Sequence, residues 1–239
     1  MKNKITTVLF DLDGTLLPMD QERFAKGYFG RLSARMARHG YDPKGFIDAI
    51  WAGTAAMVKN DGKETNETVF FRTFSALTGK NAEADKPYFE DFYRTEFDRV
   101  KDDCGFAPEA AQTVKLVKSL GLRVALATNP LFPYMATESR IRWCGLEPCD
   151  FELYTSYENS SYCKPNLDYY RSVTERLGVS PEECLMVGND VGEDMIAERL
   201  GMRVFLLTDC LINREGEDIS KYPHGSFPEL WEFLKNLNK

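Results

Sequence analysis

Residues 5–17 read ITTVLFDLDGTLL, and this stretch decides the fold class. Its first six residues are apolar or β-branched, which predicts a buried strand over residues 5–10. The strand runs into the acidic turn Asp11-Leu12-Asp13-Gly14, so two carboxylates stand at its carboxyl end. The segment therefore predicts a buried strand with polar residues at the edge of its sheet.

Four later apolar runs predict the rest of the sheet, the second of them weakly, at residues 122–127, 151–154, 184–187 and 203–207. Helical patterns separate or follow these runs, at residues 108–120, 134–144, 167–177, 193–200 and 228–237. Short apolar strands that alternate with helices are typical of a parallel sheet covered on both faces. We therefore predict an α/β protein with a doubly wound, Rossmann-like parallel sheet.

One connection is too long for this scheme. A βαβ unit takes about 30 residues, yet Thr15 and Thr128, which close the first two strand motifs, are 113 positions apart. The surplus is rich in helix formers and aromatic residues, and structureless loops of such length are uncommon in compact domains. We predict an insert of mainly four helices at residues 18–104, and a core domain formed by residues 1–17 and 105–239.

Composition and charge restrict the class of protein. The chain has 239 residues, of which 43% are hydrophobic and 28% charged, and a net charge of −7. An acidic balance argues against nucleic acid or anionic membranes as partners. Residues 1–7 are too short and polar for a signal peptide, and no apolar stretch approaches the ~20 residues of a membrane span. The six cysteines lack Cys-x-x-Cys spacing, so we expect reduced thiols in a cytoplasmic protein.

Polar groups follow four of the predicted strands. Ligands of doubly wound sheets bind outside the carboxyl ends of the strands, where the sequence places Asp11 to Thr15, Thr128-Asn129, Lys164-Pro165, and Asn189-Asp190 with Asp194. Each group alone also fits a turn, a helix cap or a solvated side chain. Together, in this order and at one edge of the sheet, they indicate a catalytic site.

The same segments resemble a known family. FDLDGTLL, LATNP, CKP and VGNDVGED are similar, in order, to the four signature motifs of the haloacid dehalogenase-like (HAD) hydrolase superfamily. The resemblance spans the whole chain, and the predicted insert resembles the C1-type cap of that superfamily. It implies a magnesium-dependent phosphatase that acts on a small phosphorylated metabolite.

The resemblance also implies a role for each motif residue. Asp11 matches the nucleophile, which forms an aspartyl-phosphate. Asp13 matches the acid that protonates the leaving group and then activates water as a base. The Thr128 hydroxyl, the Asn129 backbone N–H and the Lys164 ammonium would bind and neutralise the phosphoryl oxygens.

Magnesium would be held by oxygen ligands, which suit this ion. The resemblance assigns this role to the carboxylates of Asp11 and Asp190 and to the backbone carbonyl of Asp13. Asp194 is expected to support the metal through water or to orient Lys164. Asn166 stands where many relatives carry an acid, and we expect it to cap the following helix.

Several alternatives stay open. Dehalogenases of the superfamily lack an acid two residues after the nucleophile, so Asp13 favours phosphoryl chemistry. A phosphomutase of the β-phosphoglucomutase type and a non-catalytic HAD-fold binding protein remain as alternatives. The insert is expected to act as a mobile lid, hinged near residues 16–18 and 105–108. Its candidate substrate contacts are Met19, Asp20, Arg23, Phe24 and Trp51.

Overall fold

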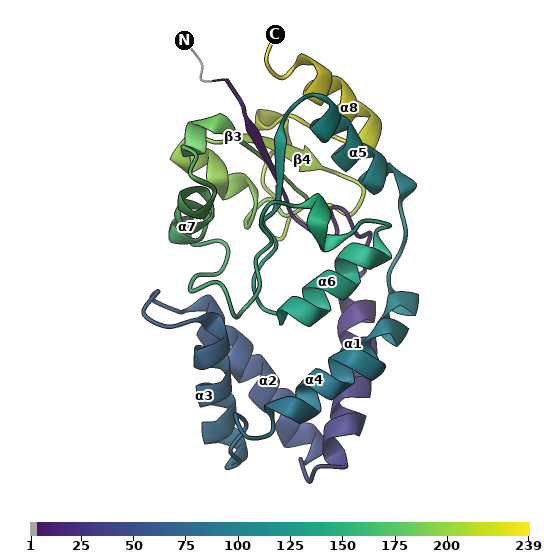
Figure 1. Ribbon diagram of the computed structural model, residues 1–239, viewed down its shortest axis with the longest axis vertical. Coiled ribbons are helices and arrows are strands. Elements are labelled where there is room, and N and C mark those ends of the chain that lie inside the picture. Colours follow the sequence, from purple (N-terminus) through teal and green to yellow (C-terminus); the bar gives the residue numbers. More distant parts are fainter. Residues whose placement is uncertain (1–3) are drawn as a thin grey trace.

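The central sheet of the protein is parallel throughout (Figure 1). The computed structural model describes residues 4–239. Residues 1–3, which belong to the N-terminal segment judged too short and polar for a signal peptide, lie outside the described residues. The strand order is β2-β1-β3-β4-β5, with the bounds Arg123–Leu126, Thr7–Phe10, Cys184–Gly188, Arg203–Leu207 and His224–Gly225. Phe10, the last residue of β1, lies opposite Leu126 of β2 and Val187 of β3. The carboxyl ends of the three strands are therefore level.

The side chains of β1 alternate between two cores. Val8 and Phe10 pack on the face covered by α5 (Pro108–Ser119) and α8 (Phe227–Asn236). Leu9 packs on the opposite face, covered by α7 (Leu167–Leu177) and a 3₁₀ helix at Met195–Leu200. Because both faces are covered, each strand is apolar at nearly every position. The prediction of a doubly wound parallel sheet is confirmed.

Two predicted elements differ from the structure. Residues 151–154, expected to form a strand, run parallel to β2 and share backbone hydrogen bonds with it, from Glu152 to Val124 and from Leu126 to Leu153. They nevertheless form an isolated bridge between Leu126 and Tyr154 and not a strand. The helix expected at residues 193–200 is the 3₁₀ helix Met195–Leu200. Its start is displaced because Asp194 directs its carboxylate to Lys164 and to the backbone of Asp190.

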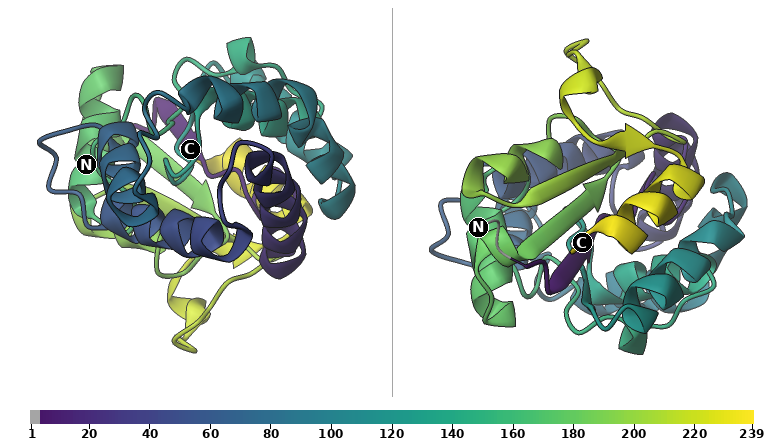
Figure 2. Two further views of the ribbon diagram at one scale, coloured as in Figure 1. Left: turned by 90° about the horizontal axis from the view of Figure 1, so that it is seen from below. Right: turned by 90° about the horizontal axis from the view of Figure 1, so that it is seen from above.

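A second group of helices lies beyond the carboxyl ends of the strands (Figures 1 and 2). It contains α1 (Gln21–Ala37), α2 (Pro43–Val58), α3 (Asn66–Thr78), α4 (Lys86–Thr95) and a 3₁₀ helix at Phe97–Asp103. Asp20, Asp42 and Thr65 accept backbone hydrogen bonds at the starts of α1, α2 and α3, as N-cap residues do. We call residues 18–104 the helical insert.

The helices of the insert pack around aromatic side chains. The rings of Phe46, Phe74 and Phe89 lie 5.4 to 6.0 Å apart between centroids, mostly edge to face. Such pairs stabilise by more than their buried area alone. These rings belong to one continuous cluster of buried residues that also contains Val8 and Phe10, so the insert and one face of the sheet share a core.

The two ends of the helical insert run beside each other. The Gly105 N–H donates to the Pro18 carbonyl over 2.7 Å, and Met19 pairs with Cys104 in an antiparallel bridge. Helix α6 (Tyr134–Trp143) forms a further contact, since Trp143 stacks on Phe97 at 5.0 Å between centroids. In residues 4–239, no helix combines the length and apolarity that crossing a bilayer requires.

Candidate active site

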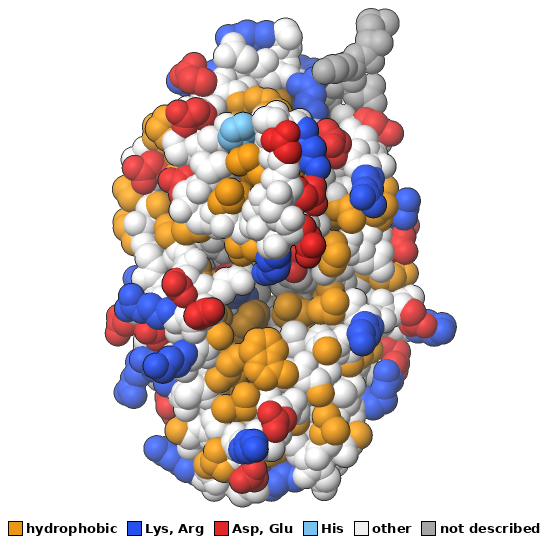
Figure 3. All heavy atoms as spheres, turned by 180° about the vertical axis from the view of Figure 1, so that it is seen from behind, with side chains coloured by type: hydrophobic (Ala, Val, Ile, Leu, Met, Phe, Trp, Pro, Cys, Tyr) orange, Lys and Arg blue, Asp and Glu red, His pale blue; other side chains and the backbone are white. Residues whose placement is uncertain are grey.

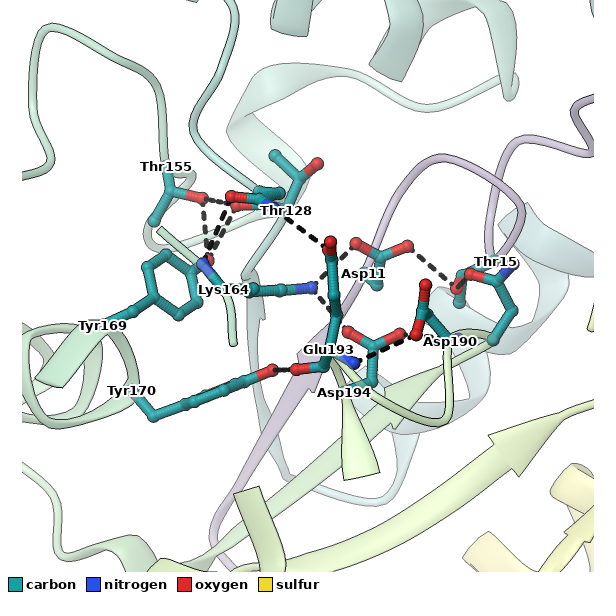
Figure 4. A network of polar contacts seen from close by, with 12 residues as sticks. Asp11, Thr15, Thr128, Thr155, Lys164, Tyr169, Tyr170, Asp190, Glu193 and Asp194 are labelled. Carbon is teal, nitrogen blue, oxygen red and sulfur yellow. Dashed lines mark hydrogen bonds and ion pairs between the residues drawn. The ribbon is translucent and has the colours of Figure 1, made fainter. Parts of the chain in front are cut away.

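Asp11 stands where β1 ends, at the level where the neighbouring strands also end (Figure 4). Its Oδ1 accepts a hydrogen bond of 2.9 Å from Lys164 Nζ, and its Oδ2 accepts one of 3.0 Å from the Thr15 hydroxyl. Gly14 has φ +89°, and a Cβ there would lie 2.3 Å from Asn189 Nδ2. Only glycine fits this turn without strain, so Gly14 allows the loop to bring Thr15 back to Asp11.

Lys164 is buried and lies between two carboxylates. Its Nζ donates to Asp11 Oδ1 and, over 2.6 Å, to Asp194 Oδ1. Burial alone lowers the pKa of Lys164, but Asp11 and Asp194 outweigh it and raise that pKa well above its usual value. Lys164 therefore carries its charge at neutral pH and neutralises part of the acidic cluster.

Asp194 is engaged on both carboxylate oxygens. Oδ1 accepts from Lys164, and Oδ2 accepts from the Asp190 backbone N–H over 3.0 Å. Burial raises the pKa of Asp194, while Lys164 acts in the opposite direction. Because these contacts use both oxygens, Asp194 is placed to orient Lys164 and the loop that begins at Asp190.

Asp13 forms an ion pair with Arg140 of α6. The Arg140 side chain is fully buried, and it also donates to the Ala136 carbonyl (3.2 Å) and to the Thr137 hydroxyl (3.3 Å). Its guanidinium lies 4.4 Å from the centre of the Phe132 ring. Arg140 is thereby fixed from several sides, and it fixes Asp13 in turn.

The two oxygens of Asp13 differ. Oδ2 faces Arg140, whereas Oδ1 is the one oxygen of this residue without a hydrogen-bond partner in the part of the chain described. The pKa of Asp13 is raised, first by burial and also by the charge of Asp11, while Arg140 and Lys164 oppose the shift. Within the described residues, no donor of the protein therefore stabilises a negative charge on Oδ1.

Asp190 lies directly after β3. Its Oδ1 accepts from the backbone N–H groups of Gly192 (2.8 Å) and Glu193 (3.0 Å), which fixes the turn. Its Oδ2 accepts from Arg214 over 2.7 Å, and Arg214 reaches Gln21 of the helical insert over 3.4 Å. A partly exposed arginine of the protein therefore occupies the second oxygen of Asp190.

Thr128 and Asn129 are held by the residues around them. The Thr128 carbonyl accepts from the hydroxyls of Thr155 (2.6 Å) and Tyr169 (2.8 Å). The Asn129 side chain accepts from the Lys164 backbone N–H (3.2 Å) and donates to Glu193 (3.0 Å). Both residues line the same cavity as Asp11, so the groups predicted from the four strand ends meet at one place.

This cavity has a volume of about 360 Å³ and lies between the sheet and the helical insert. Three of the five predicted insert contacts, Met19, Phe24 and Trp51, line it. Asp20 instead caps α1, and Arg23 pairs with Asp103. These two residues line a shallower neighbouring pocket, so the structure separates them from Asp11.

The donor set of the site fits a hard divalent cation. Asp11 and Asp190 place carboxylates on the cavity, and oxygen ligands are those that Mg²⁺ prefers. Residues 4–239 contain no group of three or more His, Cys, Asp or Glu side chains arranged to hold a metal. A metal here would therefore also need the main-chain carbonyl of Asp13 and water, which Mg²⁺ commonly retains.

Sequence reasoning missed Arg140 and Arg214. The sequence gives a weak indication for Arg140, because this residue shares the buried face of α6 and its C-terminal end with Ala136, Ile141 and Cys144. A charged residue on an apolar stripe indicates a buried partner. Arg214 lies in an irregular loop after β4, and no local pattern identifies it.

Two curated proteins are similar in sequence to this chain. One is a glyceraldehyde 3-phosphate phosphatase of Methanocaldococcus jannaschii, 31% identical over 55% of this chain and 58% of that protein. The chain thus spans little more than half the length of this relative. The other is a ribulose-1,5-bisphosphate 5-phosphatase of Halopiger xanaduensis, 24% identical over 84% of both.

Solved structures share the fold. A 2-haloacid dehalogenase of Pseudomonas syringae pv. tomato aligns with a TM-score of 0.64 at 19% identity, over 97% of this chain and 99% of its own. The magnesium-bound HAD-hydrolase YfnB of Bacillus subtilis, whose structure reveals interdomain movement, aligns with a TM-score of 0.54 at 18% identity, over 97% and 99%. The family model of haloacid dehalogenase-like hydrolases matches residues 5–199, so the chain belongs to this family of hydrolases.

Proposed function

We propose that this protein is a magnesium-dependent phosphatase that hydrolyses a small phosphate monoester through an aspartyl-phosphate on Asp11. One observation carries the proposal: two carboxylates two residues apart have opposite surroundings. Asp11 accepts from a charged lysine and a hydroxyl, whereas Asp13 has a raised pKa and one unpartnered oxygen. Carboxylates in such contrasting environments divide nucleophilic and acid roles between them.

In the first step, an Asp11 oxygen attacks phosphorus and the ester P–O bond breaks. Asp13 donates its proton to the departing alkoxide, so that the alcohol leaves neutral. Lys164 offsets the negative charge of the phosphoryl oxygens, and the Thr128 hydroxyl donates a hydrogen bond to them. Arg140 keeps Asp13 oriented while it gives up the proton.

In the second step, Asp13 acts as a base and takes a proton from a water molecule. The water oxygen attacks phosphorus, the Asp11–phosphorus bond breaks, and inorganic phosphate leaves with Asp11 restored. Mg²⁺, held by Asp11, Asp190 and the Asp13 carbonyl, would neutralise phosphate charge and align the reacting groups. Both steps need Asp13 to exchange a proton, in agreement with its raised pKa.

Phosphoryl chemistry agrees better with the site than dehalogenation does. A dehalogenase has no alkoxide to protonate, and so it needs no acid beside the nucleophile. Here Asp13 is fixed by a buried arginine. The two curated relatives described above are also named phosphatases.

We further propose that the helical insert, residues 18–104, is a lid of the C1 type. The cavity that contains Asp11 is bounded by both the sheet and the insert, so relative movement would open it. The two connecting segments run side by side at Pro18 and Gly105, where a small rotation would move all four helices together. The interdomain movement named for the YfnB structure supports such a motion.

Hydrolysis of p-nitrophenyl phosphate with and without Mg²⁺ tests the proposed activity. We expect turnover that EDTA removes and Mg²⁺ restores, and that Asp11→Asn lowers by several orders of magnitude. Asp20→Asn is a matched control, because it makes the same change at a nearby helix cap where asparagine is equally suitable. The proposal fails if no turnover occurs with Mg²⁺, or if Asp11→Asn stays within tenfold of wild type.

A further inference from the structure

The wall of the cavity that faces Asp11 is built from aromatic side chains. The helical insert contributes eight of them, Phe24, Tyr28, Phe29, Trp51, Phe70, Phe71, Phe89 and Tyr93, and the segments after β2 add Phe132 and Tyr157. In Figure 3, hydrophobic side chains gather below the hollow between the two halves of the molecule. The catalytic groups and this apolar wall thus belong to one cavity.

Three hydroxyls on the same wall are already paired. The hydroxyls of Tyr28 and Tyr93 lie 2.6 Å apart and bond to each other, and the Thr54 hydroxyl donates to the Ile50 carbonyl over 2.9 Å. Burial raises the pKa of Tyr28 to about 12, so this phenol stays neutral. A substrate hydroxyl placed against these three paired groups would lose water without gaining a free partner among them, which disfavours a polar group at this part of the wall.

Trp51 stands at the open side of the cavity. Its side chain is 53% exposed and packs on Phe29 at 5.0 Å between ring centroids. Single exposed aromatic residues are common on protein surfaces, but Trp51 also lines the cavity that contains Asp11. The face of a tryptophan ring suits a flat apolar ring. The cavity volume of about 360 Å³ accommodates one such ring together with a phosphate group.

We propose, on the basis of the phosphatase activity proposed above, that the substrate is the phosphate monoester of an alcohol that carries a flat aromatic ring. The ring packs against Trp51 and the phenylalanines of the insert, while the phosphate reaches Asp11. This class differs from the sugar phosphates named for the two curated relatives. The aromatic wall is the part of the site that would make the difference.

Two esters with leaving groups of similar basicity provide the test: 2-phenylethyl phosphate and ribose 5-phosphate. Because both release a primary alcohol, a difference in kcat/KM reflects recognition of the organic part. We expect kcat/KM for 2-phenylethyl phosphate to be at least tenfold higher. Trp51→Ala should lower it about fivefold or more and leave the value for ribose 5-phosphate within twofold.

Tyr88→Ala is the matched control. Tyr88 is also an exposed aromatic residue on a helix of the insert, but it stacks on His39 at 3.8 Å, away from the cavity lining. It should leave both kcat/KM values unchanged. A loss at Trp51 that Tyr88→Ala reproduces would overturn the assignment, because it would reflect the fold of the insert and not the binding of a ring.

A binding measurement separates this inference from the proposed activity. Calorimetry with the Asp11→Asn variant and Mg²⁺ should show 2-phenylethyl phosphate bound at least tenfold tighter than ribose 5-phosphate. If that preference holds while no ester is hydrolysed, the aromatic site stands and the phosphatase proposal fails. If p-nitrophenyl phosphate is hydrolysed but ribose 5-phosphate equals or exceeds 2-phenylethyl phosphate in affinity and kcat/KM, the aromatic inference is overturned.

Discussion

Arg140→Met removes the buried partner of Asp13 and leaves a side chain of similar length in α6. Breaking a buried ion pair costs about 3–5 kcal/mol when the remaining charge stays buried. The Asp13 side chain is 24% exposed to the cavity, so solvent recovers part of this loss. We expect the free energy of unfolding to fall by about 2–3 kcal/mol at pH 8.

The loss in stability should depend on pH with a defined sign. The folded-state pKa of Asp13 already lies above its unfolded value, and removal of Arg140, which lowers it, raises it further. A carboxyl with a raised folded pKa favours folding below its unfolded pKa, near 3.9, and loses that contribution as the pH rises through the folded pKa. Arg140→Met should therefore cost less at pH 5 than at pH 8 in urea unfolding.

The kinetic effect follows from the same carboxyl. Loss of a positioned general acid costs about 10²–10⁴-fold, and we expect kcat to fall about a hundredfold because Asp13 remains present but is poorly oriented. The falling limb of kcat/KM, where Asp13 deprotonates, should move to higher pH. Arg140→Lys keeps the positive charge but loses the geometry of the guanidinium. It should bring the falling limb of kcat/KM back towards its wild-type pH and restore kcat to a smaller extent.

Asp13→Asn supplies the control for the effect on stability. An amide needs no counter-charge, so Arg140→Met should cost little further stability in the Asp13→Asn background, and the difference between the two backgrounds measures the coupling. Equal losses in both backgrounds, or a pH profile that does not move, would refute the role of Arg140 as the positioning residue of Asp13.

Three other outcomes are expected. Asp190→Ala should raise the Mg²⁺ concentration for half-maximal activity more than Asp194→Ala, in activity titrations; the reverse order would contradict the ligand assignment. Asp194→Ala should instead lower kcat at saturating Mg²⁺, since Lys164 loses one of its two carboxylate contacts. Arg214→Ala should lower the Mg²⁺ concentration for half-maximal activity about threefold to fivefold, because it removes a cation that competes with the metal for Asp190. The ion pair of this partly exposed arginine contributes about 1 kcal/mol or less. An unchanged or higher requirement would show that Arg214 does not compete with the metal.

The sequence predicted those parts of the site that depend on local order. A buried strand followed by an acidic turn specifies where Asp11 and Asp13 lie, because parallel strands end at one edge of the sheet. The same rule places Lys164 and Asp190 near them. The expectation for Asn166 is confirmed for the same local reason, since its side chain accepts from the Asp168 backbone N–H at the start of α7.

The remaining features depend on contacts between distant segments. Residues 151–154 have the composition of a strand, but they pair with β2 only in part because the chain there turns to place Thr155 beneath Thr128. Arg214 meets Asp190 only through the course of an irregular loop. The contact between Thr155 and Thr128 and the contact between Arg214 and Asp190 do not follow from any regular spacing of residues along the chain. Hydrophobic periodicity therefore cannot predict them.

The aromatic wall and the acid of the active site are joined by direct contacts. Asp13 pairs with Arg140, and the guanidinium of Arg140 lies 4.4 Å from the centre of the Phe132 ring. Phe132 in turn packs edge to face against Phe24 and Tyr28 of α1, with centroids 6.0 and 5.3 Å away. A ring bound as proposed would lie against α1 and contact, through Phe24 or Tyr28, the residue that supports Arg140. Because close-packed interiors transmit strain, we expect occupation of the aromatic wall to influence the position of Asp13.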